Sequence, residues 1–293
     1  MPQALANGIQ IEYETFGTPQ ARPLLLTMGL GGQMILWEET FCEALADRGH
    51  YVVRYDNRDV GLSTKFENAG SPDLMSMMLD PGSAPAPAYT LADMAADGVG
   101  LLDALGIESA HLCGASMGGM IVQTMALQHA GRVRSMTSIM STTGNPALPP
   151  ADPAVAARLV MEPAQNRQEA IDRVVETFKV IGSPGFDFDE VAVRDKAACG
   201  YDRCFLPSGQ ARQLAAILSQ PNRVPELQKL AIPTLVVHGT DDPLVPVAGG
   251  KDTAEAVPGA ELWLVEGMGH DLPKAIEAEL VDRMTSLSER ADS

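Results

Sequence analysis

The stretch that decides the fold is Gly114-Ala115-Ser116-Met117-Gly118-Gly119. An apolar run at 109–113 precedes it and indicates a buried strand, whereas the apolar run at 120–127 indicates a helix. A serine between a strand and a helix, with glycines two residues before and two after it, matches the G-x-S-x-G nucleophile elbow. A side chain at Gly114 or Gly118 would clash with so tight a turn. The pattern therefore predicts that the Ser116 hydroxyl is presented at the end of a strand, beside the positive end of a helix.

Strand and helix patterns alternate along most of the chain. Asn7-Gly8 is a hairpin signal that joins a short first strand to an alternating strand at 9–14. Further strands are expected at 23–28, 51–55, 133–140, 234–238 and 261–265, and helices at 38–48, 90–105 and 273–288. Strands that alternate with helices imply a mostly parallel sheet covered on both faces. With the strand before Ser116 and the hairpin, this α/β sheet is expected to have eight strands.

Residues 146–220 break this alternation, because they contain no convincing strand pattern. Several prolines open the segment, and apolar residues then recur at helical spacing: Ile171, Val174, Val175, Phe178 and Ile181. Two more helical stretches are expected near 188–200 and 209–219. We expect a helical lid that is inserted after the sixth strand and covers Ser116. The core domain would then comprise 1–145 and 221–293. The alternative is simply more helical domain.

Composition narrows the possible partners and surroundings. The chain has 293 residues and a net charge of −17, which argues against nucleic acid and anionic membranes as partners. No apolar run is long enough to span a membrane, and the start of the chain shows no signal-peptide pattern. These features favour a cytoplasmic protein, and its four scattered cysteines are expected to be free thiols. Monomer and homodimer both remain open.

A serine nucleophile needs a base to take its proton and an acid to orient that base. Of the five histidines, His50 and His129 flank elements and are expected at the surface, whereas His111 and His238 lie within strands and are expected in the core. His270 differs, because it lies in a glycine-rich loop just after the last strand. Catalytic groups gather at that edge of an open α/β sheet. His270 is therefore the predicted base.

The acid should follow the strand at 234–238, where Gly239-Thr240-Asp241-Asp242-Pro243 offers two aspartates. An Asp-Asp-Pro cluster also favours a turn for local reasons. One aspartate can shape this turn while the other reaches His270, and the residues alone do not choose between Asp241 and Asp242. The order of serine, then aspartate, then histidine matches that of α/β-hydrolases.

These motifs make the chain resemble an α/β-hydrolase over nearly its whole length. The resemblance rests on three motifs: the elbow, the stretch Gly239-Thr240-Asp241-Asp242-Pro243-Leu244-Val245-Pro246 and the stretch Gly267-Met268-Gly269-His270-Asp271-Leu272-Pro273. In that family the acid usually lies three residues after the glycine, which implies Asp242. The loop at 54–64 and Met28-Gly29-Leu30-Gly31-Gly32 are similar to the bacterial carboxylesterase branch that includes aclacinomycin methylesterase.

The same resemblance implies an oxyanion hole made by the backbone N–H groups of Met117 and Leu30. Met28 stands where most relatives have histidine, but the donors are backbone groups. Asp56 and Arg58 are expected to form a hydrogen-bonded pair that shapes their loop. Asp59 stands where many relatives have glycine, and the sequence does not explain it. The chain has no metal-ligand spacing and no dinucleotide signature, so no metal and no cofactor are expected.

Taken together, the resemblance implies a serine carboxylesterase that hydrolyses small to medium carboxylic esters through an acyl-enzyme. Cofactor-free perhydrolysis of the haloperoxidase type, lactone opening and carbon–carbon bond hydrolysis use the same triad and stay open. Non-catalytic uses of the fold, as a receptor, scaffold or binding module, would leave the ordered triad unexplained. An apolar acyl or alcohol group would suit the expected lid, which carries Leu159, Val160, Met161, Phe178 and Phe188.

Overall fold

The computed structural model describes residues 2–79 and 85–293; residue 1 and residues 80–84 of the expected core domain lie outside the described residues. The described chain forms an eight-stranded sheet in the order β1-β2-β4-β3-β5-β6-β7-β8. The strands are β1 (Gln3–Ala6), β2 (Ile9–Phe16), β3 (Arg22–Thr27), β4 (His50–Tyr55), β5 (Ala110–Ala115), β6 (Val133–Ile139), β7 (Thr234–Gly239) and β8 (Glu261–Val265). Strands β3 to β8 are parallel, whereas the β1–β2 hairpin pairs antiparallel with β4. The expected mostly parallel sheet is confirmed.

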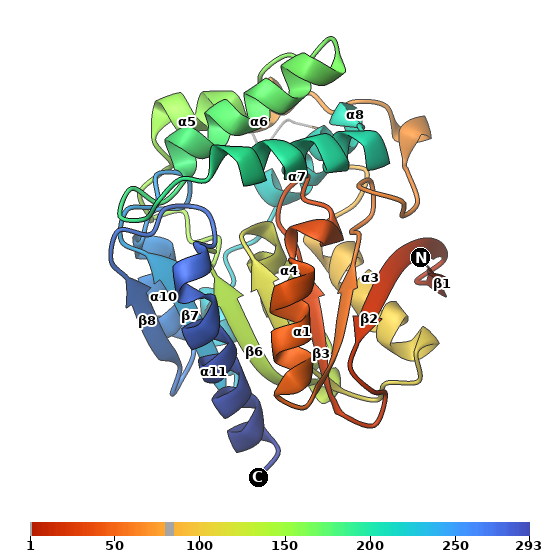
Figure 1. Cartoon of the computed structure of the whole chain (residues 1–293), viewed down its shortest axis with the longest axis vertical. Coiled ribbons are helices and arrows are strands. Elements are labelled where there is room, and N and C mark those ends of the chain that lie inside the picture. Colours follow the sequence, from red (N-terminus) through yellow and green to blue (C-terminus); the bar gives the residue numbers. More distant parts are fainter. Residues whose placement is uncertain (1, 80–84) are drawn as a thin grey trace.

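Helices cover both faces of this sheet (Figure 1). On one face, α1 (Glu39–Asp47) and α11 (Lys274–Ala291) pack over an apolar layer that includes Leu45 and Leu280. On the other face lie α3 (Leu91–Ala104), α4 (Met117–Gln128), α9 (Val224–Leu227) and α10 (Ala248–Ala256). Thr90 forms a capping box with Asp93, which explains where α3 begins. Helices α2 (Leu74–Leu79) and α10 were not predicted, because they lack an extended apolar stripe.

Residues 146–220, all of which are described, contain no strand, and we call them the helical segment. Its helices are α5 (Pro153–Arg158), α6 (Arg167–Ile181), α7 (Glu190–Arg203) and α8 (Pro207–Leu218). They lie together at one end of the sheet, on the side where β6 and β7 finish (Figure 1). In the expected stripe of α6, Ile171, Val175 and Ile181 are buried, whereas Val174 is exposed. The stripe is therefore only partly used for packing.

The predicted environments of the histidines and cysteines are confirmed at most positions but not at His50. His111 and His238 are buried as expected, but the prediction for His50 was wrong. His50 is the first residue of β4 and is fully buried, because α11 covers this end of the strand and places Ser288 Oγ 3.3 Å from its Nε2. The four cysteines are free thiols, as expected.

Within residues 2–79 and 85–293, no helix is long and apolar enough to cross a bilayer.

Candidate active site

Ser116 sits in a strained turn between β5 and α4. Its φ of 56° and ψ of −119° place it in a conformation that side-chain-bearing residues rarely adopt. The turn is held because Ser116 N–H donates to Ile139 O at 2.9 Å. A Cβ added at Gly114 would lie 2.1 Å from Gly118 O, and one added at Gly118 would lie 2.0 Å from Thr27 O. Both glycines are therefore required for the chain to make this turn.

His270 and Asp242 reach Ser116 from the loops that follow β8 and β7. His270 Nε2 lies 2.9 Å from Ser116 Oγ, and His270 Nδ1 lies 2.7 Å from Asp242 Oδ2. His270 is 8% exposed and Asp242 is 6% exposed, so water has little access to this chain of hydrogen bonds. The structure thus brings together three residues that span 154 positions of the sequence, at the sheet edge where the sequence predicted them.

The two neighbouring aspartates have different partners. Burial of Asp242 opposes its ionisation, but the charge of His270, the His238 ring 3.6 Å away, the hydrogen bond with His270 and the Val245 N–H outweigh burial and lower the Asp242 pKa to about 2. Asp241 instead accepts from the Thr240 hydroxyl at 2.6 Å and from Gly267 N–H at 3.1 Å. Asp242 therefore faces His270 as a carboxylate, while Asp241 joins two loops.

The two expected oxyanion donors belong to segments that adjoin Ser116. Met117 is the first residue of α4, where a backbone N–H has no acceptor within the helix. Residues 29–32 form a turn in which Gly32 N–H donates to Gly29 O at 3.1 Å. This turn touches the nucleophile, because a Cβ added at Gly29 would lie 3.1 Å from Ser116 Cβ. Leu30 follows directly, so its N–H is carried by a turn packed on Ser116.

Asp56 and Arg58 do not pair with each other, so that prediction was wrong. Asp56 accepts from Met34 N–H and Leu62 N–H at 2.8 Å each, and it forms an ion pair with Arg203 of α7. Arg58 instead binds Asp97 of α3 through two hydrogen bonds of 2.6 and 2.7 Å. Each residue has a nearer buried partner from another element, and the loop is shaped by these partners.

Asp59 gains an explanation that sequence reasoning missed. It has a positive φ of 68°, and its carboxylate accepts two hydrogen bonds from Arg212 of α8, at 2.7 and 2.8 Å. Tyr89 OH and Phe66 N–H donate to the same carboxylate. Asp59 therefore ties the helical segment to the core. The only hint in the sequence was that Asp59 stands where many relatives have glycine. Nothing in the sequence indicated that Arg212 would be its partner.

A cavity of about 1480 Å³ opens over Ser116 and His270. The sheet side contributes Leu30, Trp37 and Leu280, and the helical segment contributes residues from α5, α6, α7 and α8. Leu159, Val160, Met161 and Phe178 line it, as the sequence suggested. Phe188 does not; it is 40% exposed outside the cavity lining.

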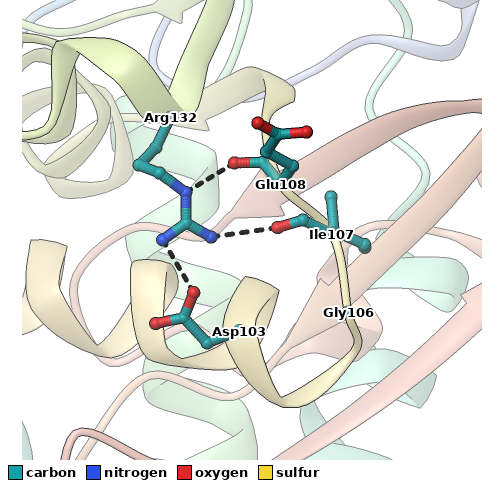
Figure 2. Close-up of a pocket in the computed structure, with 5 residues that line it drawn as sticks. All are labelled: Asp103, Gly106, Ile107, Glu108 and Arg132. Carbon is teal, nitrogen blue, oxygen red and sulfur yellow. Dashed lines mark hydrogen bonds and ion pairs between the residues drawn. The ribbon is translucent and has the colours of Figure 1, made fainter.

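A second hollow, of about 380 Å³, lies far from this chemistry beside the end of α3. Figure 2 shows Arg132 pointing at Asp103 and at the backbone oxygens of Ile107 and Glu108. The three contacts measure 2.7, 2.9 and 2.5 Å. The guanidinium is thus used to hold the turn after α3, and this hollow is structural.

Comparison with known families agrees with this geometry. A family described as alpha/beta hydrolase fold matches residues 22–183, and one described as TAP-like protein matches residues 212–284. The first match covers more than half of the chain, and the chain belongs to the α/β-hydrolase fold family. The predicted fold class is confirmed.

Among curated relatives, rhodomycin D methylesterase DauP of Streptomyces sp. (strain C5) is 29% identical over 91% of each chain. 3-Oxoadipate enol-lactonase 2 of Acinetobacter baylyi is 26% identical over 89% of this chain and 86% of its own. The esterase RhEst1 from Rhodococcus sp. ECU1013 superposes with a TM-score of 0.74 at 21% identity, covering 100% of this chain and 98% of its own. The resemblance to the methylesterase branch is confirmed; the structural likeness shows the fold alone.

Proposed function

We propose that this chain is a serine carboxylesterase whose catalytic triad is Ser116, His270 and Asp242. The observation that carries the proposal is the continuous hydrogen-bonded chain from Asp242 through His270 to Ser116 Oγ, at 2.7 and 2.9 Å, on the wall of the large cavity. A free serine hydroxyl is a weak nucleophile, and this arrangement supplies the base that activates it.

The reaction uses side chains, backbone groups and water. His270 Nε2 accepts the Ser116 proton as Oγ attacks the ester carbonyl, and the resulting oxyanion is held by the Met117 and Leu30 N–H groups. His270 then protonates the departing alcohol, and water repeats the sequence on the acyl-enzyme. One oxyanion donor is worth about 100- to 1000-fold in rate, so both positions matter.

Asp242 keeps His270 in the required tautomer and balances the imidazolium that forms. Its pKa of about 2 means that it remains a carboxylate throughout the working range of an esterase. The Leu244 and Val245 N–H groups hold its second oxygen at 2.9 and 2.8 Å, so the carboxylate is also fixed in orientation.

The helical segment acts as a cap on the core formed by 1–145 and 221–293. It supplies much of the cavity wall, and a volume of about 1480 Å³ accommodates more than a short-chain ester. Two relatives named as methylesterases make the methyl ester of a bulky acid a good candidate substrate. Free thiols at Cys199 and Cys204 and the acidic surface fit a cytoplasmic enzyme.

The proposal is tested by hydrolysis of p-nitrophenyl esters from acetate to palmitate and of a bulky methyl ester, with Ser116→Ala as the control. We expect turnover that falls to background in the variant, and the preferred ester reports the cavity's effective size. Turnover of none of these esters, together with failure of a fluorophosphonate to label Ser116, would contradict the proposal. Labelling without ester turnover would move the search to lactones, such as those named for the enol-lactonase relatives.

A further inference from the structure

The turn at residues 29–32 is held from two sides by buried side-chain amides. Asn57, on the core side, donates from Nδ2 to Met28 O at 2.9 Å. Gln213, on α8 of the helical segment, accepts from Gly31 N–H through Oε1 at 2.8 Å. The turn that carries Leu30 is therefore fixed by one amide from each part of the molecule.

Both polar atoms of Gln213 are used, and the side chain is fully buried. Its Nε2 donates to Arg58 O at 2.7 Å while its Oε1 faces the Gly31 N–H. A carbonyl on one side and an N–H on the other permit only one orientation of the amide. Gln213 does not line the cavity, so it has no direct contact with a bound ester.

The α8 backbone around Gln213 is itself anchored. The adjacent Arg212 binds Asp59 through two hydrogen bonds, and a Cβ added at Gly209 would lie 2.3 Å from Asp59 O. The helix thus packs backbone to backbone on the loop after β4. Gln213 is held in place from its own side and can impose its position on the turn.

We propose that Gln213 is a positioning residue: it holds the turn at residues 29–32 in the conformation in which the Leu30 N–H can serve as an oxyanion donor. This inference rests on the proposed esterase function. Gly31 has a φ of +66° and Leu30 does not have a positive φ, so the Gly29 O to Gly32 N–H turn is of type II. In the competing type I turn, the peptide between Leu30 and Gly31 is rotated by about half a turn. That rotation would remove the Gly31 N–H from Gln213 and present the Leu30 carbonyl to Oε1 instead, so that two acceptors would face each other.

Gln213 therefore favours one state of the turn. The rotating peptide and the peptide that bears the Leu30 N–H share the Leu30 Cα, so loosening one loosens the other. In this way the helical segment contributes to transition-state stabilisation through a side chain, Gln213, that does not itself line the cavity.

The test compares Gln213→Met with the matched control Gln228→Met, which changes an exposed glutamine outside the cavity. The readouts are the second-order rate of fluorophosphonate labelling of Ser116, and kcat and KM for the best ester. We expect Gln213→Met to lower the labelling rate and kcat by about 10- to 100-fold, less than the loss of a whole oxyanion donor. KM should stay within about twofold, because Gln213 does not line the cavity. A labelling rate equal to that of wild type, or a change confined to KM, would overturn the proposal.

A second variant, Gln213→Glu, guards against simple misfolding. A buried glutamic acid is favoured in its neutral form, which can still accept from Gly31 N–H and donate to Arg58 O. Its labelling rate relative to wild type should therefore rise as pH is lowered, whereas the relative rate of Gln213→Met should be flat. A labelling rate for Gln213→Glu that stays as low as that of Gln213→Met at every pH would contradict the positioning role. If wild type is labelled but no ester is turned over, the esterase function fails while the labelling comparison still decides the role of Gln213.

Discussion

The sheet core and the helical segment meet over the same cavity, but they hold their residues in different ways. In the core, Ser116 is placed by a strained backbone and by glycines with no room for a Cβ. The helical segment is fixed instead by buried side chains, such as the Arg203–Asp56 and Arg212–Asp59 ion pairs. Substitutions in the core are therefore expected to alter the chemistry, whereas substitutions in the helical segment are expected to alter stability and substrate fit, with Gln213 as the proposed exception.

The segment is also tied to the loop that carries the base. His270 N–H donates to Ile181 O at 2.6 Å, and Gly269 N–H donates to Ser183 Oγ at 2.9 Å. Both contacts come from the end of α6 and the residues just after it. The helical segment therefore contacts the turn at residues 29–32 through Gln213 of α8, and the His270 loop through the end of α6 and the residue Ser183 that follows it.

The largest expected effect belongs to the core. His270→Gln should lower kcat/KM by up to about a million-fold, because removing the base disables the triad as a unit. The variant should keep its fold, and ester turnover with a thermal melt measures both. A loss of less than about tenfold in a folded variant would show that another group takes the serine proton, and that the chemistry does not depend on the core residue His270.

The next largest effect is expected to distinguish the two neighbouring aspartates, Asp241 and Asp242. Asp242→Asn should lower kcat by about 10,000-fold, since an amide cannot fix the required tautomer of His270. Asp241→Asn is the matched control and should retain most activity, because its partners are Thr240 and Gly267. Steady-state kinetics of both variants decide the question. A larger loss at Asp241 would shift the orienting role by one residue.

The contrast between the core and the helical segment also explains which residues of the site could be predicted from the sequence and which could not. Ser116, His270 and the aspartate pair lie in glycine-rich turns after strands, where local pattern is informative. Arg212 and Gln213 lie within a helix that carries no recognised catalytic motif, and a polar residue on a helix usually faces water. Their partners come from loops more than 150 positions earlier, so only the folded chain could reveal the contacts. His50 was misjudged for a similar reason, since α11 covers it from the far end of the sequence.

A smaller effect is expected where the segment joins the core. Arg212→Met should lower the free energy of unfolding by about 3–5 kcal/mol, because it leaves the Asp59 carboxylate buried without its cation. Urea denaturation measures the loss. The double variant Asp59→Asn with Arg212→Met should recover part of it, since no unpaired charge remains. Wild-type stability in Arg212→Met would mean that the segment is held by apolar packing alone.

The smallest expected effect is a pH dependence of stability, and it belongs to the core, because all five histidines lie outside residues 146–220. Burial lowers the pKa of His111 from 6.5 to about 4, although Asp292 opposes this. The unfolded chain therefore binds a proton that the folded chain refuses, and stability falls as pH drops from 6.5 to about 4. His111→Asn should remove up to about 3 kcal/mol of this fall, measured as the unfolding free energy against pH. The control is His129→Asn, which changes the half-buried histidine that caps the C-terminal end of α4. An unchanged slope in His111→Asn would place the acid sensitivity elsewhere, including the carboxylate pairs of the helical segment.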